Sequence, residues 1–463
     1  MDATREEILS GQAGLDGLRH LLYGRASRAA LRRELTALLE PGAQLGACRL
    51  ERAKFKPDRK LTGYYVASIS STDRRLVRGV EVVWSPGETA DGEPPAETSM
   101  QDEARAAGVA APFRALRADG PAFGLHVAPL DVTFPQLVRL STPDHVRELM
   151  SATYARAGDG GVAAAYTVST MRYRPRQRHV LRYDPAGTAG RTVFAKLYRQ
   201  GGAERAARVT HAVADRVERA GPGVSAVRPL PAPEADDVAI YPLVPGSPMS
   251  RHLWDGPAVA GHLARAGELL RALHDGGDEP GVELRADDLD AQVRATARAA
   301  EHLGPLVPGA AAEVGRLLDR VRELGSALPP EPSGFAHGDF KADHVWVARG
   351  ELTLLDFDTC CLAEPALDVG KFLADLSWWH AVSDRPGLVE AQQQFLRGYG
   401  PTSDHRLARA RLYETVVLTR IVVRRLRRFE PDWALRTTAL VARAAQGLDG
   451  VAGQASLSGS AAS

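Results

Sequence analysis

The chain has 463 residues, of which 44% are hydrophobic and 25% are charged, and its formal net charge is +1. This length allows two or three domains with sizeable cores, and the composition is ordinary for a soluble globular protein. The near-neutral charge gives no general attraction to nucleic acid or to a membrane surface, so we expect neither as a partner.

The cysteines and the apolar pattern indicate the compartment. The chain has three cysteines, and the adjacent Cys360 and Cys361 exclude a disulfide framework and favour a reducing compartment. No Cys/His pair elsewhere has zinc-site spacing, so we expect both to be buried small residues. The first residues lack the apolar run of a signal peptide, and no run approaches the roughly 18–20 residues that span a bilayer. We therefore expect a cytoplasmic protein, and the sequence leaves its oligomeric state open.

Residues 1–160 predict an α+β accessory domain. Residues 15–40 have apolar side chains at helical spacing, and residues 48–84 contain three extended stretches. The proline, glycine and glutamate of residues 85–99 predict a loop or a short linker. The sequence GDGG at 158–161 predicts the boundary of this domain.

The rest of the chain predicts a lobe rich in strands followed by a lobe rich in helices. Residues 161–240 contain three consecutive strand-like stretches, a helical stretch and two more strands. Residues 241–450 are mostly helical, apart from a block at 335–358. This order is typical of a two-lobed α+β architecture. The tail at 451–463 is small and polar, and we expect it to be disordered.

One internal repeat connects the accessory domain to the strand-rich lobe. KFKPDRKLTGYY at 54–65 and RYRPRQRHVLRY at 172–183 align without gaps. The second copy leads to a strand that contains Lys196, whereas the first leads to GVEVVW, which has no lysine. A duplicated lobe with a degenerate first copy explains this pattern. Two similar proline-containing hairpins on a basic surface are the alternative.

The block at 335–358 contains the residues that phosphoryl transfer requires. Residues 337–344 read HGDFKADH, and a predicted hairpin then leads to Asp356. Such a transfer needs one carboxylate to accept or orient the proton of the acceptor hydroxyl, and a second to hold Mg²⁺ on the phosphates. Asp339 is placed to be the first group and Asp356 the second. Lys341 is suited to offset charge on the transferring phosphoryl group.

This block resembles the catalytic loop of the aminoglycoside phosphotransferase and choline kinase superfamily, which has the pattern H-G-D-x-x-x-x-N followed by a hydrophobic residue, Asp and Phe or Trp. The resemblance covers about 161–450 and implies a protein-kinase-like fold, ATP and Mg²⁺ as cofactors, and a small-molecule acceptor. It also implies that Asp368 organises the C-terminal lobe, and we expect His337 to be a buried residue that orients the catalytic loop. The extra N-terminal region looks like that of the maltokinases, in architecture only.

The same resemblance implies a nucleotide site between the two lobes. Lys196 matches the lysine that holds the α- and β-phosphates, and Glu204 matches its ion-pair partner, with Glu218 as the second choice. The segment that looks like the hinge, where backbone groups would contact adenine, includes Tyr241, Leu243 and Val244.

Two features depart from the family pattern. No glycine-rich loop precedes Lys196, and the hairpin turn there is RPRQR at 174–178, so a basic turn or backbone alone would cover the phosphates. His344 stands where the pattern has Asn, and imidazole is a softer ligand than Mg²⁺ prefers. His344 therefore binds Mg²⁺ poorly, favours Mn²⁺, reaches the metal through water, or leaves the role to Asp358.

We expect ATP- and metal-dependent phosphorylation of a hydroxyl on a small molecule, such as an aminoglycoside, a sugar or another natural product. The alternatives are a kinase of peptide Ser/Thr in natural-product maturation and a pseudokinase that acts as a nucleotide sensor or scaffold.

Two charged segments could indicate the charge of the acceptor. The acids of residues 285–292 either recognise a cationic acceptor or begin a helix. We expect the basic stripe at 419–433 to be a solvated face or a salt-bridge surface rather than an anion site.

Overall fold

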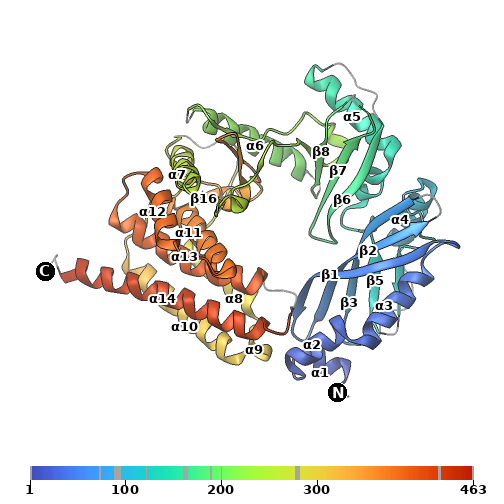
Figure 1. Cartoon of the computed structure of the whole chain (residues 1–463), viewed down its shortest axis with the longest axis horizontal. Coiled ribbons are helices and arrows are strands. Elements are labelled where there is room, and N and C mark those ends of the chain that lie inside the picture. The colour runs from blue at the N-terminus through green and yellow to red at the C-terminus, as the bar shows by residue number, and fades with distance from the viewer. Residues whose placement is uncertain are drawn as a thin grey trace. The chain divides into compact units, whose positions relative to one another are not determined.

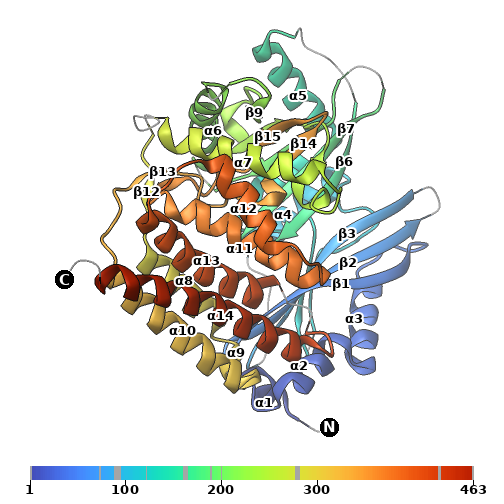
Figure 2. The same cartoon turned by 60° about the vertical axis from the view of Figure 1, so that its left-hand side comes forward.

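The computed structural model describes residues 3–71, 74–87, 95–120, 122–159, 165–187, 190–199, 201–219, 221–276, 282–425 and 429–460. The chain divides into two compact units (Figures 1 and 2). Within the described ranges, no helix is both long enough and apolar enough to cross a bilayer. The first unit comprises residues 1–207, 229–243 and 427–431, and the second comprises 208–228, 244–426 and 432–463.

The first unit begins with three helices and an antiparallel sheet of strand order β1-β2-β3-β5-β4. The helices expected within 15–40 and the three expected extended stretches are present. The elements are α1 (Arg5–Ser10), α2 (Gly14–Tyr23), α3 (Arg25–Ala37), β1 (Gln44–Lys56), β2 (Lys60–Ser71), β3 (Arg74–Trp84), α4 (Pro95–Ala106), β4 (Arg117–Asp119) and β5 (Gly124–Val127).

A second antiparallel sheet in the same unit has the strand order β10-β8-β7-β6. Apolar side chains of the segment 128–154, including those of α5, pack on this sheet and form one core with it. The predicted boundary after residue 160 lies outside the described residues, so the predicted domain limits stay a prediction. The elements are η1 (Pro135–Leu137), η2 (Arg139–Ser141), α5 (Pro143–Ala157), β6 (Tyr166–Arg174), β7 (Arg178–Pro185), β8 (Val193–Leu197), α6 (Gly202–Arg219), η3 (Glu234–Asp236) and β10 (Val238–Pro242). Of these, α6 belongs to the first unit as far as Ala207 and to the second from Arg208.

The two sheets follow the same path through the chain. Each has a hairpin, a third strand beside it, a helix and a further strand that pairs with the third: β1-β2-β3-α4-β5 in one, β6-β7-β8-α6-β10 in the other. Both repeat copies form the hairpin turn, and the residue after the turn proline is left-handed in each, with φ 58° at Asp58 and 63° at Arg176. The register places Val83 opposite Thr62, where Lys196 lies opposite Val180. This shared topology is what a duplicated lobe with a degenerate first copy predicts.

The second unit consists mainly of helices, with two small sheets. The sheets have the strand orders β11-β14-β15-β9 and β12-β16-β13. Helices α10 and α14 run side by side in both views, and α11, almost entirely buried, packs against α13 (Figures 1 and 2). The elements are β9 (Val224–Ala226), β11 (Ser247–Pro248), η4 (Met249–Arg251), α7 (Ala258–Asp275), β12 (Arg285–Ala286), α8 (Leu289–Ala300), α9 (Leu303–Leu306), α10 (Pro308–Ala327), β13 (Gly334–Ala336), η5 (Ala342–His344), β14 (Val345–Ala348), β15 (Glu351–Leu354), β16 (Cys361–Ala363), α11 (Ala366–Ser383), α12 (Leu388–Tyr399), α13 (Asp404–Arg425) and α14 (Trp433–Ser460).

Two segments differ from the sequence-based expectation. The linker expected at 85–99 ends earlier, because α4 begins at Pro95, and proline suits the first turn of a helix, where its missing N–H has no partner in any case. The tail expected to be disordered from 451 is helical as far as Ser460, as a continuation of α14. Extending a helix costs much less than nucleating one, so a packed helix can carry a weak sequence beyond its core.

Candidate active site

Asp368, at the start of α11, holds the beginning of the HGD loop in place. Its side chain is fully buried. One carboxylate oxygen accepts the backbone N–H of His337 at 2.6 Å, and the other accepts that of Gly338 at 2.8 Å. These hydrogen bonds and the nearby imidazoles offset the effect of burial, which alone would raise the pKa of Asp368, and keep the pKa below its usual value. Asp368 therefore organises the loop, as the resemblance implied.

His337 ties the loop to the strand end that carries Asp356. Its side chain is fully buried, and its Nε2 lies 3.0 Å from the backbone carbonyl of Leu355, which can only accept. Its Nδ1 therefore accepts the backbone N–H of Asp339, at 3.2 Å. Burial lowers the pKa of His337, so the ring is neutral at neutral pH. Both ring nitrogens therefore have partners, and His337 links the loop at Asp339 to the strand end at Leu355.

Gly338 is required by the geometry of the loop. Its φ is 72°, in the left-handed region, and an added Cβ would lie 2.2 Å from the backbone carbonyl oxygen of Thr359. The side chain of Thr359 also donates to the backbone carbonyl of His337, at 3.2 Å. The HGD segment and the chain after Asp358 are therefore in direct contact, which only a residue without a Cβ allows.

Two lysines hold the carboxylate of Asp339. Lys341 Nζ lies 2.7 Å from one oxygen, and Lys371 Nζ, from α11, lies 2.9 Å from the other. Lys371 also donates to the backbone carbonyl of Gly338 at 2.6 Å. Burial alone would raise the pKa of Asp339, but the charge of Lys371, with smaller effects of His344 and Lys341, holds it well below its usual value. Asp339 is therefore ionised at neutral pH.

His344 lies between the two acids and is a neutral imidazole with a defined tautomer. Its Nδ1 is 3.0 Å from the backbone carbonyl of Asp339, which can only accept, so Nδ1 carries the proton. Its Nε2 then has a free lone pair and lies 3.4 Å from a carboxylate oxygen of Asp356. Burial lowers the pKa of His344 to about 4. A backbone carbonyl on one ring nitrogen is the usual arrangement when the other nitrogen binds a metal.

These residues form a group that can hold a divalent metal. One ligand atom each from Asp339, His344 and Asp356 lies within 4.8 Å of the other two. Asp356 has a φ of 64°, and non-glycine residues in this left-handed region are enriched at active sites. Two carboxylates and one imidazole suit Mn²⁺ at least as well as Mg²⁺. Asp358, the expected alternative to His344 as a ligand, is not part of this group among the described residues.

The residues expected to hold the nucleotide lie in the strand-rich part of the chain. Lys196 is on β8, paired with Ala239 on β10, and its Nζ lies 5.8 Å from the ring centre of Tyr198. Glu204 is exposed in the first turn of α6, in the same compact unit as Lys196. The second choice, Glu218, is ion-paired with Arg228 at 2.8 Å.

The expected hinge coincides with the division between the compact units, which falls between Leu243 and Val244. Tyr241 belongs to β10, and Leu243 is 49% exposed. The N–H of Leu243 donates to the backbone carbonyl of Thr192 at 3.2 Å, so this hinge N–H already has a partner in the described structure.

The basic turn before Lys196 is fastened to the accessory sheet. Arg176 Nη2 donates to Glu81 at 2.6 Å, and the backbone N–H of Arg176 donates to Asp131 at 2.7 Å. Gln177 in the same turn donates to the hydroxyl of Tyr64 at 3.0 Å. The guanidinium of Arg176 is therefore ion-paired with Glu81 in the described structure, and the cover of the phosphates by this turn or by backbone alone stays a prediction.

Sequence reasoning missed Lys371 as a member of the site. Gly370-Lys371-Phe372 does not match the P-loop phosphate-binding motif, because the upstream glycine and the Ser/Thr are absent. The available signal was helical spacing, since Lys371 is three residues after Asp368 and a helix places both on one face. Asp368 and Lys371 therefore contact the same loop. Asp368 accepts the N–H of Gly338, and Lys371 contacts the carbonyl of Gly338 and the carboxylate of Asp339.

Two other groups prove to be structural. Cys360 and Cys361 are buried, as expected, and burial raises the pKa of Cys361 to about 12, so its thiol is not reactive. Of the acids in 285–292, Asp288 accepts the backbone N–H of Ala291 at 2.6 Å and caps α8. Asp287 accepts a hydrogen bond from Gln292 at 2.8 Å. The interpretation of this segment as a helix start is therefore confirmed for Asp288.

Comparison with known proteins defines the class. The Phosphotransferase enzyme family (APH) matches residues 178–412, about half of the chain, which include the strand of Lys196, the HGD loop and Asp356. The protein is thus a phosphotransferase with the α+β, kinase-like fold expected from the sequence. It belongs to the Phosphotransferase enzyme family.

Solved structures of kinases are similar to parts of this chain, and none of the curated proteins matches it. A choline/ethanolamine kinase family protein from Mesorhizobium loti is 18% identical, over 66% of this chain and 94% of that one, with a TM-score of 0.45. The amicoumacin kinase hAmiN, solved with AMP-PNP, Ca²⁺ and Ami, is 15% identical over 60% and 88%, with a TM-score of 0.44. APH(2")-IIia, solved with GDP and kanamycin, is 13% identical over 65% and 98%, with a TM-score of 0.45.

Proposed function

We propose that this phosphotransferase moves the γ-phosphoryl group of ATP to a hydroxyl of a small molecule, with a divalent metal held by Asp356 and His344. The observation that carries the proposal is the convergence of Asp339, His344 and Asp356 within 4.8 Å, with two lysines on Asp339. A metal bound there would neutralise charge on the β- and γ-phosphates. Lys196 would anchor the α- and β-phosphates with Glu204 as its partner, and backbone groups from Tyr241 to Val244 would bind adenine.

In the proposed reaction the acceptor's hydroxyl oxygen forms a bond to the γ-phosphorus, and the bond from that phosphorus to the bridging oxygen of ADP breaks. The hydroxyl proton passes to Asp339. Because the pKa of Asp339 lies well below its usual value, the carboxylate is a weak base, and it acts first by orienting the hydroxyl. The proton is transferred late, when the new bond to phosphorus has made the hydroxyl acidic. Lys341 offsets charge on the phosphoryl group, and Lys371 keeps the carboxylate in place.

The test is transfer of labelled phosphate from ATP to a panel of sugars, aminoglycosides, other hydroxylated small molecules and Ser/Thr peptides, with Mg²⁺ and with Mn²⁺. We expect transfer to a small molecule, and a loss of at least about 10³-fold in kcat for Asp339→Asn with nucleotide binding retained. Equal rates for the wild type and Asp339→Asn would contradict the proposal. Thermal stabilisation by ATP and metal without any transfer would favour a nucleotide sensor.

A further inference from the structure

A cavity of about 240 Å³ opens beside Asp339, and its walls carry more positive than negative charge. Its lining side chains come from the catalytic loop, from Thr359 and from α11 and α13, all within the second compact unit. The cavity is smaller than the roughly 300–1,000 Å³ of sites that enclose drug-sized ligands, so it fits a small acceptor. Its charged lining residues are four cations, Lys341, Lys371, Arg420 and Arg424, and two acids, Asp339 and Asp375.

The acids of the cavity are already engaged. Asp339 holds both lysines, at 2.7 Å and 2.9 Å. Asp375 accepts the backbone N–H of Ala342 at 3.0 Å and the indole N–H of Trp379 at 3.2 Å. A single carboxylate thus faces two lysines, and the charged residues of the lining, four cations and two acids, carry a net charge of +2.

Arg420 and Arg424 form no hydrogen bond and no ion pair with any residue that the structure describes. Only 9% of Arg420 is exposed. Burial, and then the charge of Arg424, lower the pKa of Arg420 to about 10, so the guanidinium stays charged at neutral pH. The charges of Asp339 and Asp287 raise the pKa of Arg420. Both carboxylates already have the partners described above. A buried charge without a counter-charge is strongly unfavourable.

The helix itself does not account for this placement. Residues 417, 420, 421 and 424 of α13 line the cavity, and their spacing of three and four residues puts them on one face of the helix. The negative end of a helix dipole attracts cations only within the last turn. Arg424 is in that turn, since α13 ends at Arg425, whereas Arg420 lies more than one turn from the end. The expectation that this basic stripe is a solvated or salt-bridge surface is therefore wrong for Arg420.

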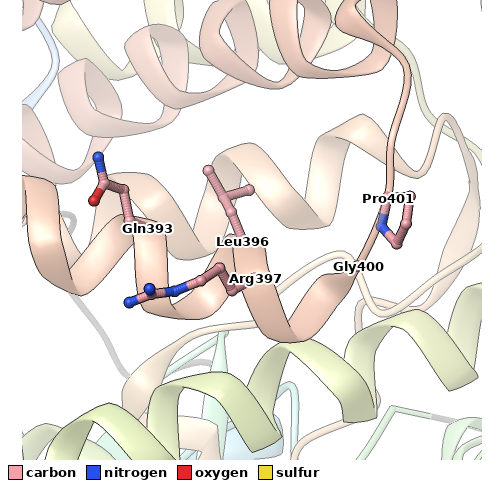
Figure 3. A pocket seen from close by; sticks show the side chains of 5 residues that line it. All are labelled: Gln393, Leu396, Arg397, Gly400 and Pro401. Carbon is pink, nitrogen blue, oxygen red and sulfur yellow. The ribbon is translucent and has the colours of Figure 1, made fainter.

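A hollow at the end of α12 provides the contrast (Figure 3). Gln393, Leu396 and Arg397 extend from the helix there, and Gly400 and Pro401 follow where the chain turns. Arg397 is 63% exposed at its side chain and is ion-paired with Glu390 at 3.1 Å. The charge of Arg397 is solvated and ion-paired, so nothing in this hollow indicates an anion site. Arg397 serves as the matched control for Arg420.

We propose that the acceptor of this enzyme carries an oxyanion, such as a phosphate, sulfate or carboxylate, close to the hydroxyl that is phosphorylated. The proposal rests on the proposed function, because it takes Asp339 as the group that orients the hydroxyl. Arg420 and Arg424 bind the oxyanion through the planar, multi-donor geometry of guanidinium, which matches such groups. The cavity repels polycations, so an aminoglycoside is disfavoured as the acceptor.

Paired acceptors that differ in charge test this substrate class. The pairs are glycerol with glycerol 3-phosphate and with glycerate, and glucose with glucose 6-phosphate and with gluconate, and kanamycin represents polycations. We expect kcat/KM for at least one anionic member to exceed that of its neutral partner by at least about 10-fold, and no transfer to kanamycin. A preference for the neutral members or for kanamycin would overturn the proposal.

Substitution of Arg420 shows whether this residue binds the acceptor or the nucleotide. Arg420→Leu should lower kcat/KM for the anionic acceptor by about 10- to 100-fold, mainly through KM, and leave the KM for ATP unchanged. Arg420→Lys should retain part of the activity, and Arg397→Leu all of it. Because it removes an uncompensated buried charge, Arg420→Leu should leave Tm unchanged or raise it. An equal rise in the KM for ATP would assign the arginine to the nucleotide and overturn the proposal, as would a fall in Tm of more than about 5 °C.

Binding of inorganic sulfate, measured by calorimetry, tests the anion site without catalysis. We expect sulfate to bind the wild type at least about 10-fold more tightly than Arg420→Leu, with Arg397→Leu equal to the wild type. Equal binding to all three would overturn the anion site even if phosphoryl transfer is observed. If sulfate binds as expected but no acceptor is phosphorylated, the proposed transfer fails while the anion site stands.

Discussion

His344 Nδ1 donates a hydrogen bond to the backbone carbonyl of Asp339 at 3.0 Å, five residues earlier in the catalytic loop. This bond fixes the tautomer of the imidazole and directs the lone pair of Nε2 toward Asp356, 3.4 Å away. A residue that looked like a defect in the family's loop pattern is thus held in the orientation of a metal ligand. His344 thus presents an imidazole nitrogen where the family's loop pattern has the amide of Asn.

The first prediction concerns metal preference. Replacing His344 by Asn supplies a hard amide oxygen at the same position, so the ratio of Mg²⁺-supported to Mn²⁺-supported activity should rise by about 10-fold. His344→Ala should lower activity with both metals by at least about 10-fold. Initial rates at saturating ATP with each metal measure the effect. An unchanged ratio in His344→Asn would show that this position does not contact the metal.

The second prediction follows from the pKa of His344, which burial lowers to about 4. Only the neutral imidazole binds metal, and protonation competes with binding as the pH falls toward the pKa. Mn²⁺ affinity should therefore be constant from pH 8 to about pH 5.5 and decline below that. A histidine with an ordinary pKa near 6.5 would instead lose half its affinity at about pH 6.5. Calorimetric titration of the ATP-bound enzyme at several pH values measures this. A midpoint near pH 6.5 that is absent from His344→Asn would contradict the prediction.

The same shift has a consequence for stability. The folded pKa of His344 lies below the unfolded value of about 6.5, so between pH 4 and 6.5 the unfolded chain binds more protons there than the folded chain. The free energy of unfolding therefore falls as the pH drops through this window, and the contribution of His344 is fully present above it. Compared with His344→Asn at pH 7 and at pH 5, the wild type should lose more stability between the two pH values. Thermal unfolding of both proteins measures the difference.

The third prediction concerns the turn that precedes Lys196. Removing the side chain of Arg176 leaves Glu81, whose side chain is 1% exposed, without its nearest cation. We expect Arg176→Ala to lower the free energy of unfolding by about 2 kcal/mol. The control is Arg182→Ala, which removes an exposed pair with Asp184 and should cost less than about 1 kcal/mol. Denaturant unfolding measures both, and equal losses would show that the buried carboxylate does not depend on Arg176.

The fourth prediction concerns Gly338. An alanine there must adopt a left-handed backbone and displace the carbonyl of Thr359, 2.2 Å from the added Cβ. We expect Gly338→Ala to cost about 1–3 kcal/mol of stability and to lower kcat, because Asp339 follows directly. Gly334→Ala, four residues earlier, is the control, since an added Cβ there meets nothing within 4 Å. Similar activity of the two variants would contradict the assigned geometry.

Much of the machinery could be predicted from the sequence, because it depends on local patterns. The HGD loop, the hairpin after it and the acid at its end are contiguous in the chain, and their spacing indicates both the structure and the chemistry. The repeat at 54–65 and 172–183 likewise predicted two similar hairpins, which the structure contains. The family membership follows from the same segments.

What the sequence left open depends on contacts between residues that are distant in the chain. The position of Lys371 on Asp339 and the burial of Arg420 beside the same carboxylate follow from the packing of α11 against α13. The sequence of a helix does not show which of its faces packs against other elements. A basic stripe is therefore expected to be solvated until the neighbouring elements are known. The sequence by itself determined that this chain has the residues of a phosphotransferase. Only the tertiary structure decided that the cavity beside Asp339 is lined by more cations than acids, because the charge of a cavity depends on which side chains the packing of distant segments brings together.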